Sequence, residues 1–156
     1  MPHSQPIPLS LYIHMPWCIK KCPYCDFNSH ALRSPLPEAA YIDALLADLD
    51  AQKGQVEGRT VDTLFIGGGT PSLFSGKALR RLIQGISALV PLGPDAEITL
   101  EANPGALDAA HTEAYRQAGI NRLSLGIQSF DSEALKVLGR IHSVDEAHQA
   151  IRIARQ

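Results

Sequence analysis

The chain has 156 residues, of which 45% are hydrophobic, and its formal net charge at pH 7 is −2. This length is typical of one domain with enough material for a sizeable core. A net charge so close to zero gives no general attraction to nucleic acid or to anionic membranes. No segment approaches the ~18 uninterrupted apolar residues of a membrane span, and the first residues lack the pattern of a secretory signal.

Strand-like and helix-like segments alternate from the start of the chain. Residues 8–15 alternate apolar and polar side chains, as a half-buried strand does, and a loop follows to about residue 33. A helix is expected from Pro37, because the apolar residues that follow repeat with helical spacing. Gly54 is expected to end this helix.

Two further strand–helix units follow. Residues 61–66 predict a second strand that runs into three glycines at 67–69, and the helix after them ends before Pro91. Residues 96–101 predict a third strand. Its helix is expected to span residues 108–119, with an aspartate as the cap and a glycine as the stop.

The last unit begins with a predicted strand over residues 122–128. A short helix is expected from Asp131 to about Gly139, and the capping box of Ser143 and Glu146 begins another helix. Four consecutive strand–helix units predict an α/β fold with a parallel sheet, either a barrel or a doubly wound sheet.

All three cysteines lie within eight residues, at Cys18, Cys22 and Cys25, so none remains for a long-range disulfide. Such clustering indicates a metal site in a reducing compartment, and we therefore expect a cytoplasmic protein. Three thiolates can hold an iron–sulfur cluster and leave one iron open to a ligand. The alternatives are a loop of free thiols or a zinc site completed by His14 or His30.

Polar residues and glycines collect where the predicted strands end. In parallel barrels, binding groups gather at the carboxyl ends of the strands and in the loops that follow. If the polar strand faces point inward, these groups line one pocket beside the cysteine loop. They are Tyr12, His14, Gly67, Gly68, Gly69, Glu101 and Gln128.

The pattern Cys-x-x-x-Cys-x-aromatic-Cys resembles the signature of the radical S-adenosylmethionine (SAM) family. Residues 11–18 and 25–30 are similar to the branch that contains the oxygen-independent coproporphyrinogen III oxidases and related heme chaperones. The resemblance covers residues 11–156 and implies a partial (β/α)6 barrel, with roughly its first four β–α units present. We expect residues 1–156 to be the N-terminal part of a radical SAM core domain, without the rest of the barrel and a C-terminal domain.

The same resemblance implies a [4Fe-4S] cluster on the three cysteines, with SAM bound to the open iron. In this family an electron from the cluster cleaves SAM into methionine and a 5′-deoxyadenosyl radical. No catalytic side chain is assigned. The positions carried over as SAM contacts are Tyr12, Tyr24, Gly68, Gly69, Thr70, Glu101, Gln128 and Arg140.

Each of these contacts has a chemical reason. The resemblance puts residues 68–70 at the amino group of SAM, and glycines let the backbone approach a ligand closely. It puts Glu101 and Gln128 at the ribose, whose hydroxyls donate well to a carboxylate. It puts Arg140 at the methionine carboxylate, which matches a guanidinium. Tyr12 and Tyr24 correspond to aromatic contacts. Each could otherwise be an ordinary surface or packing residue.

Two functions of different classes follow from the resemblance. The first is a heme chaperone that takes heme as cargo, passes it to an acceptor protein and uses an electron donor. The second is an oxygen-independent coproporphyrinogen III oxidase. The oxidase pattern usually continues Cys-x-Cys, whereas this chain reads Cys25-Asp26-Phe27. Phe27 therefore favours the chaperone. Another radical SAM enzyme, with an unrelated substrate, is the third alternative.

Overall fold

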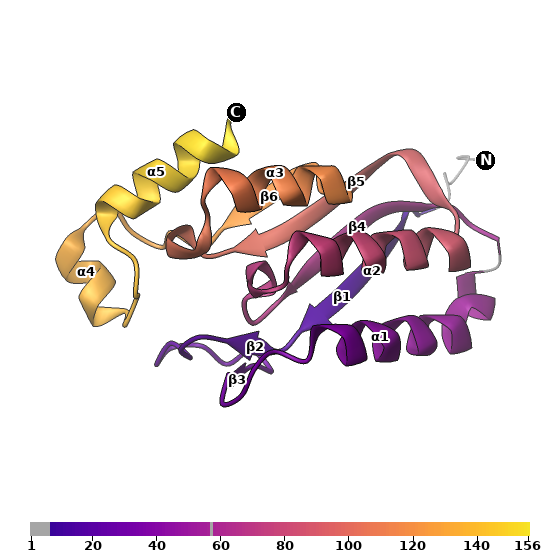
Figure 1. The fold of residues 1–156 in the computed structure, drawn as a ribbon, viewed down its shortest axis with the longest axis horizontal. Coiled ribbons are helices and arrows are strands. Elements are labelled where there is room, and N and C mark those ends of the chain that lie inside the picture. The colour runs from indigo at the N-terminus through magenta and orange to yellow at the C-terminus, as the bar shows by residue number, and fades with distance from the viewer. Residues whose placement is uncertain (1–6, 57) are drawn as a thin grey trace, which may run out of the picture.

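The computed structural model describes residues 7–56 and 58–156. Its centre is a parallel sheet in the order β1–β4–β5–β6, so the strands follow one another in space as they do in the chain (Figure 1). These strands are Leu9–Met15, Val61–Gly68, Leu92–Ala102 and Arg122–Leu125. The predicted α/β fold with a parallel sheet is confirmed.

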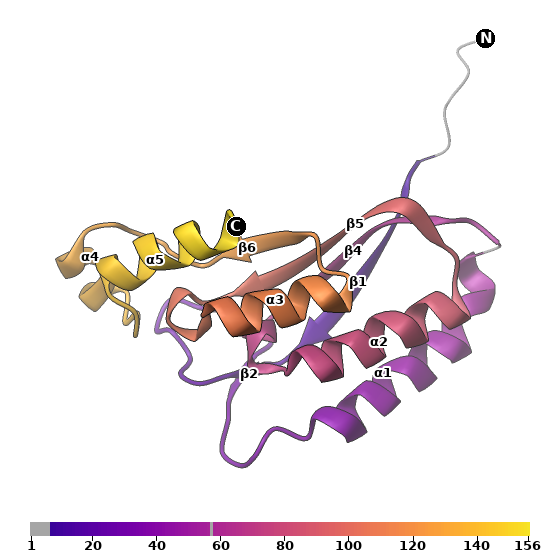
Figure 2. The same cartoon turned by 45° about the horizontal axis from the view of Figure 1, so that its top comes forward.

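Three helices cover one face of this sheet, and Figure 2 shows all three on the same side of it. They are α1 (Glu38–Gln52), α2 (Gly76–Leu89) and α3 (Ala109–Ala118). Beyond β6, the shorter α4 (Ser132–Val137) leads to α5 (Val144–Ala154) at one end of the sheet. A helix on the same side after each strand is the arrangement of a β/α barrel opened along one seam.

The core lies between the sheet and the three covering helices. Alternate strand residues point to this side, and full burial of an aliphatic side chain stabilises the fold by ~1.5–3 kcal/mol. Tyr115 of α3 is also buried there, and its hydroxyl donates to the carbonyl of Ser72 at 2.8 Å. Other core residues are Ile13, Met15, Ile42, Leu64, Ile66, Leu79, Leu82, Ile86, Ile98 and Leu100.

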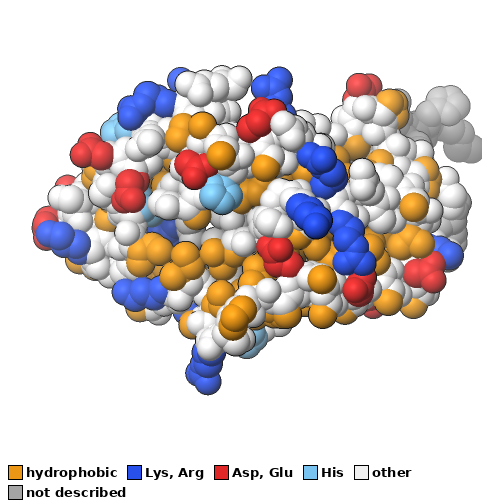
Figure 3. Space-filling model, in the orientation of Figure 1, with side chains coloured by type: hydrophobic (Ala, Val, Ile, Leu, Met, Phe, Trp, Pro, Cys, Tyr) orange, Lys and Arg blue, Asp and Glu red, His pale blue; other side chains and the backbone are white. Residues whose placement is uncertain are grey.

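Side-chain caps fix the starts of several helices. Asp108 accepts from the amide of His111, and Ser143 forms a complete capping box with Glu146, as the sequence predicts. Gly119 ends α3 with a φ of 104°, in the left-handed region that glycine favours. Over the helix-bearing face, basic and acidic side chains are interspersed (Figure 3). Arg81 of α2 pairs with Asp43 of α1.

The structure corrects several predicted boundaries. The strand predicted over residues 122–128 ends at Leu125, and Gln128 lies in the following loop with a φ of 69°, which a strand residue does not adopt. The third predicted strand begins earlier, at Leu92, as part of β5. Gly54 does not stop the helical conformation, because a 3₁₀ turn over Lys53–Val56 follows α1.

A small parallel ladder lies inside the loop after β1, where the sequence predicts no strand. It joins β2 (Trp17–Cys18) to β3 (His30–Ala31). No helix in the described part of the chain has both the length and the apolar character needed to cross a membrane.

Candidate functional site

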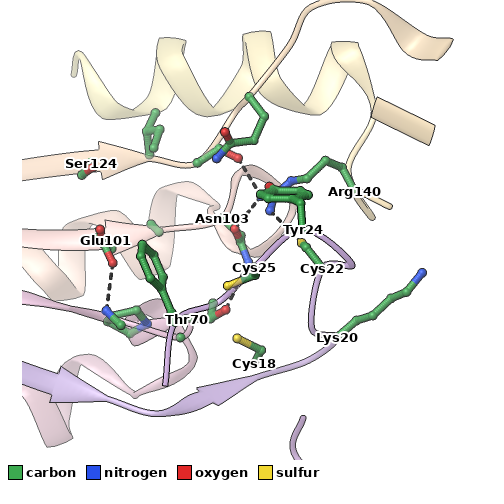
Figure 4. A pocket seen from close by; sticks show the side chains of 18 residues that line it. Cys18, Lys20, Cys22, Tyr24, Cys25, Thr70, Glu101, Asn103, Ser124 and Arg140 are labelled. Atoms are coloured by element: carbon green, nitrogen blue, oxygen red, sulfur yellow. Dashed lines mark hydrogen bonds between the residues drawn. The ribbon is translucent and has the colours of Figure 1, made fainter. Parts of the chain in front are cut away.

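A cavity of about 380 Å³ lies at the carboxyl ends of the four sheet strands (Figure 4). Its walls come from the cysteine loop, the glycine turn after β4, the end of β5, the loop after β6 and the segment before α5. The lining residues are Cys18, Lys20, Cys22, Tyr24, Cys25, Phe27, Gly68, Gly69, Thr70, Pro71, Glu101, Ala102, Asn103, Ser124, Leu125, Gly126, Gln128 and Arg140.

The three cysteines are free thiols on one wall of this cavity. Cys18 is buried, and Cys22 and Cys25 are half-buried. Among the described residues, no three His, Cys, Asp or Glu side chains gather closely enough to share one metal ion. A single zinc ion needs each sulfur at about 2.3 Å, whereas a cluster receives each thiolate on a different iron. The donor set therefore fits an iron–sulfur cluster better than a single ion.

His14 holds the far end of the cysteine loop. Its Nε2 lies 2.7 Å from the carbonyl oxygen of Asn28, and its Nδ1 lies 2.9 Å from the hydroxyl of Tyr12. A carbonyl can only accept, so Nε2 donates to Asn28, and the Tyr12 hydroxyl is the hydrogen-bond partner of Nδ1. Because both ring nitrogens have partners, His14 is engaged in holding the loop. His30, the other histidine weighed as a zinc ligand, is exposed on β3.

The glycine turn after β4 packs directly on the start of the cysteine loop. The amides of Gly69 and Thr70 donate to the carbonyls of Met15 and Trp17, both at 2.7 Å. A Cβ added to Gly69 would lie 2.5 Å from the Trp17 carbonyl oxygen, so this approach requires glycine. Gly68 has a φ of 117°, and its amide donates to Glu101 at 3.0 Å.

Arg140 closes the cavity opposite the glycine turn. One guanidinium nitrogen, Nη2, donates to Asn103 Oδ1 at 2.8 Å and to the Gly126 carbonyl at 2.6 Å. The other, Nη1, lies 3.3 Å from the sulfur of Cys22. The Nε of Arg140 is buried and has no partner among the described residues. An unpaired buried donor is costly, and a ligand carboxylate would supply the missing acceptor.

Asn103 joins two walls of the cavity and is absent from the residues predicted from sequence. Its Oδ1 accepts from Arg140, and its Nδ2 donates to the hydroxyl of Thr70 at 3.2 Å. The sequence could have indicated Asn103 as a cavity residue through its spacing from Glu101, because residues two apart at a strand end point to the same face. Ser124 lies on the polar face of β6 and also lines the cavity.

The two tyrosines occupy different places. Tyr24 lines the cavity near Arg140 and Cys22. Partial burial raises the pKa of Tyr24, and the positive charge of Arg140 opposes that rise. Tyr12 is 55% exposed, stacks on Phe65 and is not part of the cavity wall. Partial burial and, after it, the charge of Glu101 raise the pKa of Tyr12.

His142 supports the loop that carries Gln128 into the cavity wall. It is 4% exposed, and its Nε2 donates to the carbonyl of Ile127 at 3.0 Å. Burial and the nearby charge of Arg140 lower the pKa of His142. The loop between β6 and α4 is thus held from behind by a buried imidazole.

Comparison with known proteins gives concordant matches. The model of the radical SAM superfamily matches residues 12–156. The heme chaperone HemW of Escherichia coli is 56% identical over 94% of this chain and 39% of its own length. The heme chaperone HemW of Haemophilus influenzae is 51% identical over 95% of this chain and 40% of its own length.

A solved structure adds to these matches. Coproporphyrinogen III oxidase (HemN) from Escherichia coli, described as a radical SAM enzyme, matches with a TM-score of 0.85 and 32% identity. That match covers 95% of this chain and 34% of the HemN chain. The chain spans about two-fifths of the length of the two HemW relatives.

Proposed function

Because the chain belongs to the radical SAM superfamily, we propose that its cavity holds a [4Fe-4S] cluster on Cys18, Cys22 and Cys25 with SAM beside it. The cluster supplies the electron for SAM cleavage when both are bound. The support from the chain itself is the placement of three free thiols and of the proposed SAM contacts other than Tyr12 around one cavity.

Each wall has a role in binding and orienting SAM. Arg140 offers charge-assisted hydrogen bonds to the methionine carboxylate, and its partnerless Nε supports that role. The turn of residues 68–70 offers backbone carbonyl oxygens to the amino group of SAM. Glu101 and Gln128 offer an acceptor and an amide to the ribose. Tyr24 offers an aromatic face to the adenine. Tyr12 lies outside the cavity wall, where its hydroxyl contacts His14.

For the whole protein we infer a heme chaperone of the HemW type, which binds heme and passes it to an acceptor protein. The observation that carries this inference is the 56% identity to a protein named heme chaperone HemW. Phe27 supports it, because this ring lines the cavity where the oxidase pattern has a further cysteine. An electron donor, a heme acceptor and a cytoplasmic location belong to the same proposal.

The alternative is an oxygen-independent coproporphyrinogen III oxidase, which the TM-score of 0.85 to HemN favours. One experiment separates the two. The anaerobic full-length protein, with its cluster, is given SAM, a reductant, an electron acceptor and coproporphyrinogen III, and the products are followed by chromatography. In parallel, heme transfer to an apo heme protein is followed by absorption. We expect transfer without oxidase turnover. SAM-dependent formation of protoporphyrinogen IX over multiple turnovers would contradict the chaperone assignment.

The cofactor site has its own test. The full-length protein should bind about four iron and four sulfide, and Cys22→Ala should lose most of both. Glu101→Ala and Arg140→Ala should retain the cluster but weaken SAM binding by about 1.5–3 kcal/mol. The readout is the SAM-dependent change in the electron paramagnetic resonance spectrum of the reduced cluster. Arg80→Ala, on the exposed side of α2, is the control. Unchanged SAM affinity in both variants would place the SAM contacts elsewhere.

A further inference from the structure

We propose that Lys21 is a positioning residue that closes the cysteine loop and holds its thiols in place. The proposal rests on the cluster site proposed above. The ammonium of Lys21 donates to the carbonyl of Phe27 at 3.0 Å and to the carbonyl of Ser29 at 3.1 Å. Lys21 precedes Cys22, and both of its acceptors follow Cys25. Its contacts therefore bridge the segment that carries two of the three thiols.

The contact divides one large loop into two smaller ones. The base of the loop is the β2–β3 ladder, where the His30 amide donates to the Pro16 carbonyl and the Leu32 amide donates to the Cys18 carbonyl. Without Lys21, the residues between these strands would still be restrained by the turn from Cys22 to Cys25, by the contact of His14 with the Asn28 carbonyl and by the contact of Arg140 with Cys22. A shorter closed segment has fewer conformations to lose when it becomes ordered.

The segment of the loop that runs from Cys25 back to β3, its returning limb, presents backbone carbonyls to side chains. Lys21 takes those of Phe27 and Ser29, and His14 takes that of Asn28 between them. Ser29 itself is 2% exposed, so this segment is anchored to the protein at that residue. An ammonium has three donors and no acceptor, which suits a site made of carbonyl oxygens. The Lys21 contact thus fastens the segment before Cys22 to the segment after Cys25, which His14 also holds.

Lys20 provides a matched comparison one residue away. Its side chain extends away from the three thiols (Figure 4), and it makes no hydrogen bond or ion pair within residues 7–56 and 58–156. Lys20→Met and Lys21→Met therefore remove the same charge from the same loop. Only the second removes a contact between the two limbs.

The test is amide hydrogen exchange of the full-length protein without its cluster. In Lys21→Met, the amides of Ser29, His30 and Leu32 should exchange about tenfold faster, equivalent to ~1.4 kcal/mol. Lys20→Met and Lys21→Arg should exchange like the unmodified protein. Leu64 in the central strand β4 should be unchanged in all variants, which separates local loosening from global destabilisation. Equal exchange in Lys20→Met and Lys21→Met would overturn the proposal.

The second readout is retention of the cluster. After anaerobic reconstitution, a chelator should strip iron faster from Lys21→Met than from Lys20→Met. Identical rates would show that loop closure does not protect the cluster. If the unmodified full-length protein takes up no cluster, the proposed function fails. The exchange comparison still decides whether Lys21 closes the loop.

Discussion

At the scale of single residues, the Asn103 side chain links two walls of the cavity. It accepts from Arg140 and donates to Thr70, and these partners lie 37 and 33 residues away in the chain. Arg140 would otherwise be held by the Gly126 carbonyl and its contact with Cys22. Asn103 therefore sets the distance between the glycine turn and the guanidinium.

Substitution of Asn103 separates its two contacts. Asn103→Leu removes both and should weaken SAM binding about tenfold, the effect of one lost hydrogen bond to a charged group. Asn103→Asp keeps an acceptor for Arg140 and loses the donor to Thr70, so its loss should be smaller. Equilibrium dialysis with labelled SAM measures both. Equal losses in the two variants would assign the effect to the Thr70 contact.

Gln128 carries a strained backbone at the edge of the same cavity. A non-glycine residue at a φ of 69° costs on the order of 1 kcal/mol. Gln128→Gly removes this strain but gives the unfolded chain more freedom, so stability should change by less than ~1 kcal/mol while SAM binding weakens. Gln128→Asn tolerates the same φ and keeps an amide. Denaturant unfolding and SAM titration test the pair, and unchanged SAM affinity in the glycine variant would exclude an amide contact.

The sequence predicts the local parts of this site and misses the parts made by distant contacts. The cysteines and the glycine turn are encoded by short spacings, and the structure places them on one cavity. Asn103 has no such motif, because its importance arises from partners more than thirty residues away. The strand predicted to end at Gln128 is wrong because alternation of side chains cannot reveal a positive φ.

At the scale of elements, close helix packing depends on glycine at the start of α2. A Cβ at Gly76 would lie 2.5 Å from the Cβ of Ala114 and 3.0 Å from the carbonyl carbon of the same residue in α3. Since a backbone atom is involved, a side-chain rotation cannot relieve the clash. The same elements, with their helical spacing and caps, were the part of the fold most readily predicted.

Gly76→Ala should therefore destabilise the protein by about 1–2 kcal/mol, because overpacking outweighs the gain in helix propensity. Gly54→Ala is the matched control. Its added Cβ has no neighbour within 4 Å, so it should be neutral or stabilise by about 0.4–1 kcal/mol. The measurement is the midpoint of urea unfolding. A stabilising Gly76→Ala would show that α2 and α3 separate at little cost.

The helix caps make the stability of the fold depend on pH in the acid range. Hydrogen bonds from His111 hold the pKa of Asp108 below its ordinary value of 3.8, and those from Ser143 lower the pKa of Glu146. A lowered folded-state pKa stabilises the protein above the unfolded value, and that contribution is lost as the pH falls through the folded value. Stability should therefore decline below a pH of about 4.

Asp108→Asn tests this pH dependence, because asparagine is also a good N-cap but does not titrate. Its stability near neutral pH should be close to that of the unmodified protein, and its decline between pH 4 and pH 2 should be shallower. Urea unfolding across this range is the measurement. Asp95→Asn, an exposed position in β5, is the control and should leave the slope unchanged. An unaltered slope in Asp108→Asn would show that other carboxylates set this pH dependence.

At the scale of the whole molecule, α1, α2 and α3 cover one face of the sheet (Figure 2), and the cavity lies at the carboxyl ends of its strands. Both β1 and β6 are edge strands of the described sheet. We propose that further β–α units continue the sheet past β6, as the greater length of the HemW relatives suggests.

This proposal predicts a difference in hydrogen exchange between residues 1–156 and a longer natural protein. Amides of β6, such as those of Leu123 and Leu125, should be protected in the longer protein and exchange fast in residues 1–156. Leu64 and Ile66 of central β4 should be protected in both. Equal protection of β6 in the two proteins would show that no strand is added there.

The order of the strands also determines the order in which the walls of the cavity are synthesised. Cys22 and Arg140, which meet across the cavity, are separated by 118 residues. A ribosome adds about 5–20 residues per second, so Cys22 is synthesised roughly 6–24 s before Arg140. During that interval the nascent thiols lack the opposite wall of their cavity and are open to oxidation. We therefore expect the proposed cluster to be assembled after the segment around Arg140 has left the ribosome.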